Sequence, residues 1–156
     1  MQVAGLPLHI LVVHAAVVFT PLACLFAIVF AVVRRWRWAT RWPTAVLTAV
    51  TVAAVWLSRV SGNALLAARP ALAEIIGVHK ARGDQLSWIV IGFALVVLAG
   101  VLTLSGTTAL ASGRGAVEPR WPGLEMPLAI LLVAAALLTL AWVILAGDAG
   151  ARAVWS

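Results

Sequence analysis

Four long apolar runs, separated by segments that hold most of the charged residues, organise this chain. A helix needs about 20 predominantly apolar residues to cross the hydrocarbon core of a bilayer. Pro43 and Pro127 begin two of the runs, where a first helical turn tolerates a missing N–H, and Pro21 predicts a kink. The pattern predicts an all-α integral membrane protein, a four-helix transmembrane bundle in which residues 1–156 form one domain. The predicted spans are residues 8–33, 43–60, 86–104 and 126–146.

Three connections join the predicted spans. Residues 34–42 are short and basic, whereas residues 105–125 are rich in glycine and other small residues. The connection 61–85 is long and mixed. Its apolar part, residues 64–78, fits either a short helix along the membrane interface or an extension of the second or third span beyond the membrane. The sequence leaves both interpretations open.

The composition supports a membrane protein and excludes a nucleic-acid partner. The chain is 64% hydrophobic and 10% charged, with a mean hydropathy of +1.10, whereas soluble domains are about one-quarter charged. The net charge of +6 would suit nucleic acid. However, the densest basic segment, Arg34 to Arg41, lies between two spans, where arginines set topology and contact lipid headgroups. We therefore expect the lipid bilayer to be the partner.

The orientation follows from the same basic segment. Its arginines and the uncharged N-terminal tail place residues 34–42 in the cytoplasm and both termini outside it, in a multi-pass protein of the cell membrane. The first run is too long for the apolar region of a signal peptide, so we expect it to remain as a span. The eight tryptophans fall near the predicted interfaces, as amphipathic rings do: Trp36, Trp38, Trp42 and Trp121 at one, and Trp56, Trp88, Trp142 and Trp155 at the other.

The histidines and aspartates are predicted to gather at one end of the bundle, the extracytoplasmic one. Ionisable groups at membrane depth are costly and usually face the bundle interior or a water-filled cavity. His14 lies about 9 Å along an ideal helix from Leu8, below the headgroups, so it needs a partner. His9 and His14 point about 140° apart on such a helix and cannot bind one ion as an i, i+4 pair would. The residues at this end are His9, His14, Arg59, Asn63, His79, Lys80, Arg82, Asp84, Asp148 and Arg152.

Several chemistries fit this end. His14 and His79, from different helices, would suit the two axial positions of a b-type haem, with Asn63 and Asp84 orienting the imidazoles by hydrogen bonds. A transition metal ion such as zinc, copper or non-haem iron would take His9, His14, His79 and Asp148. A histidine and a carboxylate could equally serve a quinone head group or a proton path.

Simpler interpretations stand beside these. His9 fits an interfacial residue, His14 a buried residue bonded to another helix and His79 a solvated loop residue, while Asp84 and Asp148 fit charges at helix ends. The sequence has no phosphate-binding glycine loop, no CxxC or CxxCH, no HExxH and no nucleophile elbow. It therefore gives no reason to assign an enzymatic activity, and it excludes haem attached through cysteine.

Four segments of the chain resemble a known family. LPLHILVVHAAVVFTPLA in the first span, SGNALL after the second, GVHKARGDQL before the third and AGDAGARAVW at the end look like the four-helix membrane proteins grouped as domain of unknown function 2231. The most specific element is the first pair of histidines with flanking prolines. In the family pattern an acidic residue often replaces Asn63 and a histidine often replaces Asp148.

The resemblance implies a redox neighbourhood, because some relatives are joined to Rieske or cytochrome c modules. Our first hypothesis is a redox-linked protein that binds b-type haem or a metal ion, with electron transfer to or from respiratory or other redox membrane proteins or quinone. The alternative is a non-catalytic membrane subunit or scaffold that docks a larger complex, with structural histidines. A small transporter or proton path is a third hypothesis. Small residues in every span leave a homo-oligomer open.

Overall fold

The fold is an all-α bundle of four long helices, as predicted. The structure is a computed structural model that describes residues 2–3, 6–104 and 121–155. The helices are α1 (Leu8–Val32), α2 (Arg37–Ala68), α3 (Ala73–Thr103) and α4 (Glu125–Trp155). Single 3-10 turns precede three of them: η1 (Arg34–Trp36), η2 (Pro70–Leu72) and η3 (Pro122–Leu124). An antiparallel pair of two-residue strands, β1 (Gln2–Val3) and β2 (Leu6–Pro7), precedes α1.

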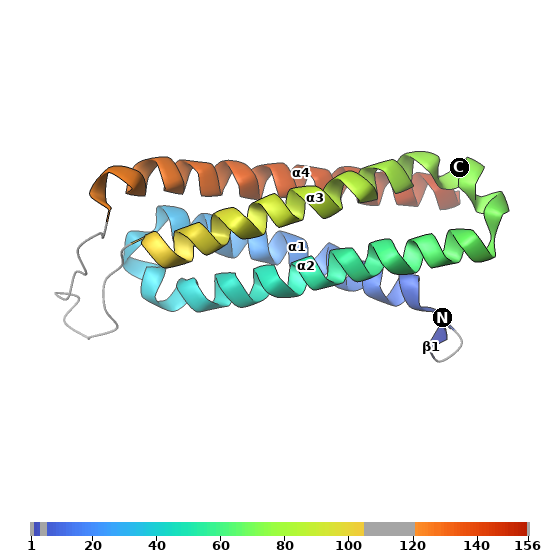
Figure 1. Ribbon diagram of the computed structural model, residues 1–156, viewed down its shortest axis with the longest axis horizontal. Helices are drawn as coiled ribbons and strands as arrows, with labels where there is room; N and C mark the ends of the chain where they lie inside the picture. Colours follow the sequence, from blue (N-terminus) through green and yellow to red (C-terminus); the bar gives the residue numbers. More distant parts are fainter. Residues whose placement is uncertain (1, 4–5, 105–120, 156) are drawn as a thin grey trace.

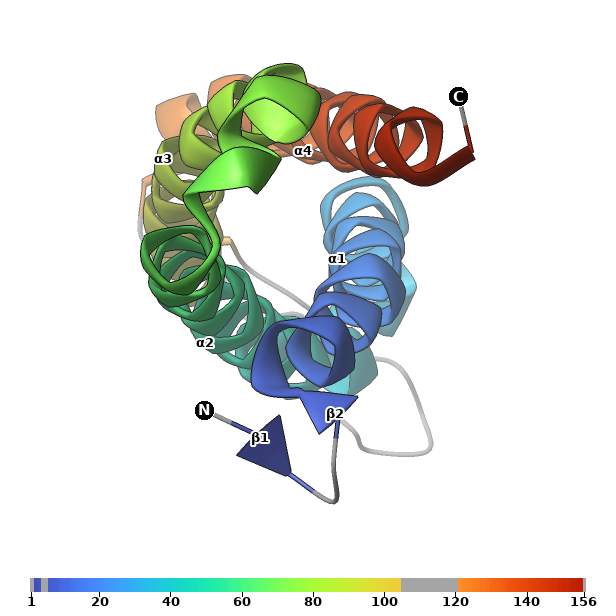
Figure 2. The ribbon, with the colours of Figure 1, turned by 90° about the vertical axis from the view of Figure 1, so that its right-hand side faces the viewer.

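The four helices form a ring in which each packs on two neighbours (Figures 1 and 2). α1 packs on α2 and α4, and α3 packs on the same two helices, so α1 and α3 face each other diagonally. The ends of the chain and the α2–α3 connection lie at one end of the bundle. We call this the histidine end, because it holds His9 and His79. The opposite end, which holds Arg34, Arg37 and Glu125, is the arginine end.

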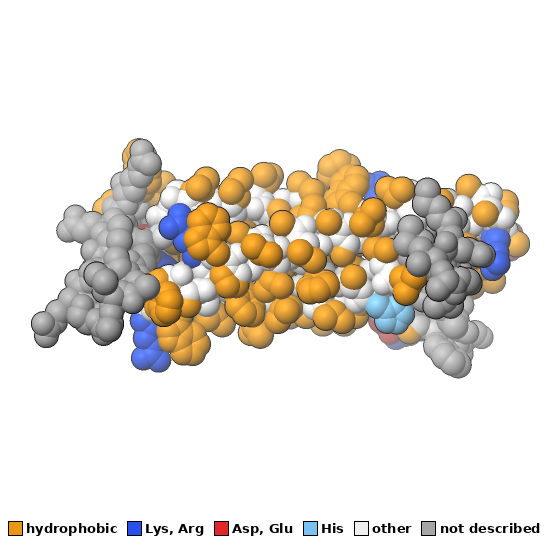
Figure 3. Space-filling view, turned by 90° about the horizontal axis from the view of Figure 1, so that it is seen from below, with side chains coloured by type: hydrophobic (Ala, Val, Ile, Leu, Met, Phe, Trp, Pro, Cys, Tyr) orange, Lys and Arg blue, Asp and Glu red, His pale blue; other side chains and the backbone are white. Residues whose placement is uncertain are grey.

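Each helix contains an apolar segment long enough to cross a membrane. The space-filling view shows hydrophobic side chains covering the middle of the visible face, with basic side chains nearer the ends (Figure 3). Val18, Leu25, Leu95 and Ile130 are examples of large apolar side chains on the outer surface. An outer surface of this kind is stable in lipid, so the chain is a multi-pass membrane protein.

The connection 61–85 is almost entirely helical, which resolves the two interpretations of residues 64–78. α2 continues to Ala68 and α3 begins at Ala73, so both helices extend past the predicted spans. The break falls at Arg69, whose φ of −140° and ψ of 75° leave the helical region. Pro70 explains this position, because a proline disfavours helical backbone in the residue before it and donates no N–H.

The bundle consists of two similar helical hairpins, α1–α2 and α3–α4. η1 leads into α2 as η3 leads into α4, so Arg37 and Glu125 hold equivalent positions as first residues of their helices. The burial pattern of α1 recurs in α3 when the two helices are aligned so that His9 matches His79. Ala16, Thr20, Ala23, Ala27, Phe30 and Ala31 of α1 correspond to Leu86, Val90, Phe93, Val97, Gly100 and Val101 of α3, and all are buried.

The burial pattern of α2 likewise recurs in α4 when the two helices are aligned so that Ser58 matches Ala146. Thr44, Thr48, Thr51, Val55 and Ser61 of α2 correspond to Leu132, Ala136, Thr139, Val143 and Ala149 of α4, again all buried. The hairpins run in the same direction, so a rotation about the long axis of the bundle relates them. Such parallel repeats are known in membrane proteins. The histidine end therefore carries two equivalent copies of one local arrangement.

Candidate binding site at the histidine end

A cavity of about 110 Å³ lies inside the histidine end and is lined by residues of all four helices. Its lining includes one buried apolar residue from each helix: Ala16, Val55, Leu86 and Val143, which are two equivalent pairs of the repeat. His9 and His79, which also form an equivalent pair, line it as well. The cavity is therefore built around the axis that relates the two hairpins.

His9 is held in place by α2. Its Nδ1 lies 3.0 Å from the Ser58 carbonyl oxygen and 3.3 Å from Ser61 Oγ. The imidazole lies flat against Gly62, where an added Cβ would come within 3.1 Å of the His9 Cε1. Gly62 thus provides the space that the ring occupies, and Ser58 fixes its direction.

His79 is held by α4 in the equivalent manner. Its Nδ1 lies 2.9 Å from the Ala146 carbonyl oxygen. The ring lies against Gly150, where an added Cβ would come within 2.9 Å of Nδ1. In both hairpins the acceptor carbonyl belongs to the residue one helical turn before the glycine, so the same contact is made twice.

The two hydrogen bonds decide the tautomer of each histidine. A carbonyl oxygen only accepts hydrogen bonds, so Nδ1 must carry the proton and Nε2 of the neutral ring keeps its lone pair. Within the described residues, Nε2 of neither histidine makes a hydrogen bond. Histidines that bind a metal commonly donate the other ring N–H to a carbonyl in this way. Two imidazoles with available lone pairs therefore line one cavity.

Charged residues border the cavity on one side. Arg59 Nε donates to Asp84 Oδ1 at 2.9 Å, and Lys80 Nζ donates to Asp84 Oδ2 at 2.7 Å. The Arg59 guanidinium also lies 5.2 Å from the centre of the Trp56 ring and 5.9 Å from that of Trp88. All three charged residues line the cavity. With two cations and one anion, this border attracts anionic groups.

The structure brings together only part of the predicted site. Asn63, His79 and Asp84 line the cavity together with His9. His14 is exposed on the outer side of α1 and does not line it. Asp148 also lies outside the lining and pairs with Arg152, its Oδ1 3.0 Å from Nε. Among the described residues, no three histidine, cysteine or acidic side chains are grouped to hold a metal ion.

Sequence reasoning missed the residues that position the two imidazoles. Ser58, Gly62, Ala146 and Gly150 are small and uncharged, so a search for ligating side chains passes over them. The signal that could have found them is the repeat. Once the two hairpins are superimposed in register, a histidine, a small residue and a glycine recur together at equivalent positions.

Comparison with known proteins identifies the family. The family described as "Predicted membrane protein (DUF2231)" matches residues 5–156. The chain belongs to this family. No curated protein and no solved structure matches it. The resemblance inferred from the histidine and glycine motifs is thereby confirmed over almost the whole chain, and with it the membrane location.

Proposed function

We propose that this DUF2231 protein binds a b-type haem in the cavity at the histidine end, where His9 and His79 would hold the iron and the haem would supply one-electron transfer in the membrane. The observation that carries the proposal is the equivalent pair of imidazoles. Each donates Nδ1–H to a backbone carbonyl and keeps Nε2 available. Haem sites in helical bundles use two histidines from facing helices in this way.

The number of ligands favours haem over a bare metal ion. A tetrahedral zinc site needs three or four protein ligands, and the described residues group only two histidines at the cavity. In a haem the porphyrin supplies four nitrogen ligands, so the protein needs to supply only two. The revised pair is His9 with His79, because His14 lies on the outside of α1.

The walls of the cavity suit a macrocycle that is apolar in its middle and anionic at one edge. Val13, Val17, Leu66 and Ile76 add apolar surface to the lining. Arg59 and Lys80 would pair with the propionates as charge-assisted donors. Because a haem is larger than the cavity, loading requires the helix ends around it to spread. Electrons would then pass to or from quinone or another redox membrane protein.

The test is the optical spectrum of the protein purified in mild detergent from a host supplied with haem. We expect a Soret band that shifts on reduction with dithionite. His9→Ala and His79→Ala should each abolish the band, since each removes one axial ligand. His14→Ala is the matched control and should leave the spectrum unchanged. A band that survives in both His9→Ala and His79→Ala would contradict the ligand assignment.

A second candidate function is a non-catalytic subunit that docks a larger complex. The same two hydrogen bonds favour it, because they tie α1 to α2 and α3 to α4, as structural polar residues do in membrane bundles. In that case the spectrum is featureless even with haem supplied. His9→Leu and His79→Leu would then lower the melting temperature and reduce assembly with the partner, and no cofactor signal would change.

A further inference from the structure

The unsatisfied polar atoms of the interior are concentrated on one helix. Among the described residues, the buried side-chain atoms without a hydrogen-bond partner are Arg41 Nε, Thr48 Oγ1, Thr51 Oγ1, Trp56 Nε1 and Ser58 Oγ, all on α2. Thr48 is 3% exposed and Thr51 is fully buried. An unpaired buried hydroxyl carries its full desolvation cost. A small bound molecule would remove this cost, because no group of the described bundle bonds to the two threonine hydroxyls.

The other buried threonines of the core behave differently. Thr20, Thr44 and Thr139 each donate to the carbonyl of the residue one turn earlier, at 2.6, 2.7 and 2.8 Å. This local bond is the ordinary way for a threonine to satisfy its hydroxyl inside a helix. Thr48 and Thr51 do not make it. Their hydroxyls remain available to a ligand in the interior.

Five buried hydroxyl side chains lie in the same part of the core, about 10 to 17 Å below the hydrogen-bonded histidines. His9 is bonded to Ser58 and His79 to Ala146, so all four helices share a reference level. At about 1.5 Å per residue, Thr51 and Thr139 lie about 10 Å below this level, and Ser87 about 12 Å below it. Thr20 and Thr48 lie about 15–17 Å below it. These five buried residues, from all four helices, are called the hydroxyl layer.

We propose that the hydroxyl layer is an internal water site, in which one or more water molecules bind the hydroxyls of Thr48 and Thr51. Buried water typically makes two to four hydrogen bonds to groups that are otherwise unsatisfied. Two hydroxyls about one helical turn apart on the same face of α2 provide donors and acceptors for such water. Backbone carbonyls of the surrounding turns each keep a second lone pair.

Water fits this layer better than a cation. A monovalent or divalent cation in a low-dielectric interior needs an anionic ligand to offset its desolvation. The hydroxyl layer consists of four threonines and one serine, with no carboxylate. The ligand class is therefore neutral and small, with both donors and acceptors.

The water site is distinct from the cavity at the histidine end. Neither Thr48 nor Thr51 lines that cavity. The repeat makes the water site asymmetric, because Thr48 is equivalent to Ala136 and Thr44 to Leu132. Thr139, the equivalent of Thr51, donates to the Ala135 carbonyl, so the hydroxyls available to water lie on the side of α2.

The first experiment is radiolytic labelling of the full chain in detergent micelles, followed by mass spectrometry. Hydroxyl radicals form from bound water and modify the side chains beside it. We expect strong labelling of the α2 peptide that contains Thr48 and Thr51. It should fall by roughly tenfold in Thr48→Val/Thr51→Val, since the isosteric change removes the groups that bind water. Thr40→Val/Thr44→Val is the matched control and should retain the labelling, because these α2 threonines lie outside the hydroxyl layer and bond to carbonyls of their own helix.

The second experiment is the melting temperature of the same variants, which distinguishes a hydrated site from a dry one. If water satisfies the hydroxyls, Thr48→Val/Thr51→Val loses those hydrogen bonds and melts at a lower temperature. If the site is dry, the same change removes a desolvation cost and raises the melting temperature. A raised melting temperature, labelling equal to that of the control pair, or a sodium-dependent rise in stability would each overturn the proposal.

Discussion

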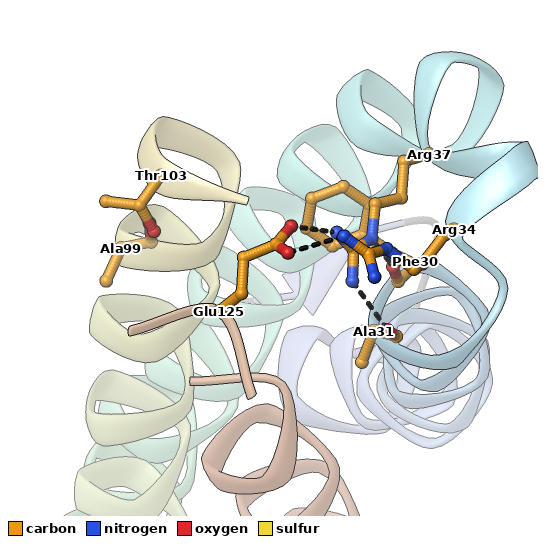
Figure 4. A network of polar contacts seen from close by, with 7 residues as sticks. All are labelled: Phe30, Ala31, Arg34, Arg37, Ala99, Thr103 and Glu125. Atoms are coloured by element: carbon orange, nitrogen blue, oxygen red, sulfur yellow. Dashed lines mark hydrogen bonds and ion pairs between the residues drawn. The ribbon is translucent and has the colours of Figure 1, made fainter. Parts of the chain in front are cut away.

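Arg37 and Glu125, the equivalent first residues of α2 and α4, form a buried ion pair in which Arg37 Nη1 lies 2.8 Å from Glu125 Oε1 (Figure 4). Arg37 also donates from Nε to the Phe30 carbonyl at 3.1 Å and from Nη2 to the Ala31 carbonyl at 3.0 Å. These carbonyls belong to the last turn of α1, which has no intrahelical donors for them. One side chain thereby joins α1, α2 and α4 at the arginine end.

Replacing Arg37 should destabilise the bundle far more than replacing its neighbour Arg34. The Arg37 side chain is 5% exposed, so Arg37→Leu leaves two carbonyls without their donor and the partly buried carboxylate with the exposed Arg34 alone. We expect a loss of about 3 kcal/mol. Arg34 binds the same carboxylate at 2.6 Å but is 67% exposed, so Arg34→Leu should cost less than about 1 kcal/mol. Unfolding in detergent measures both, and equal losses would refute the structural role given to Arg37.

Adding a methyl group at Gly150 should disturb His79, whereas the same change at Gly147 should not. A Cβ at residue 150 would lie 2.9 Å from His79 Nδ1, while nothing lies within 4 Å of a Cβ at residue 147. Gly150→Ala should therefore cost about 1–2 kcal/mol through overpacking. Gly147→Ala should stabilise α4 by up to about 1 kcal/mol through helix propensity. If haem is bound, Gly150→Ala should also weaken the Soret band, and an unchanged band would argue against His79 as a ligand.

The orientation of the bundle remains a prediction from the arginines of residues 34–42, and reporter fusions can measure it. We expect alkaline phosphatase fused after Ser156 to be active and green fluorescent protein at the same place to be dark, because both reporters depend on the side of the membrane. Fusions within residues 105–120 should give the opposite result. The reverse pattern would place the histidine end in the cytoplasm without changing the cavity.

The spans could be predicted because lipid imposes a minimum apolar length on every helix. Both interpretations of residues 64–78 were helical, but the continuation of the second and third helices through residues 61–85 could not be predicted, because charged and glycine residues there resemble a loop. The antiparallel pair of β1 and β2 could not be predicted, because strands of two residues are too short to show an alternating pattern. Residues 105–120 lie outside the described part, so the predicted connection there is untested.

The site was predicted in part, and His14 shows why. The 140° between His9 and His14 meant that only one could face the interior. His9 continues the buried stripe of Ala16, Thr20 and Ala23, whereas His14 shares its side of α1 with the exposed Val18 and Leu25. Periodicity contains this information. However, apolar neighbours are expected both in the interior of the bundle and on its lipid-facing surface, so the residues around His14 do not distinguish the two positions.

Because both halves of the repeat lie in one chain, their interior side chains can differ. Two identical hairpins in a homodimer would place like charges opposite each other at the first residue of α2 and its copy. They would also carry threonines on both inner faces. A single chain frees each half to change alone, so an arginine can meet a glutamate, and a face with threonines can meet one of leucine and alanine. The two sides of the bundle therefore differ in their charged and threonine residues, while His9 and His79 keep equivalent contacts.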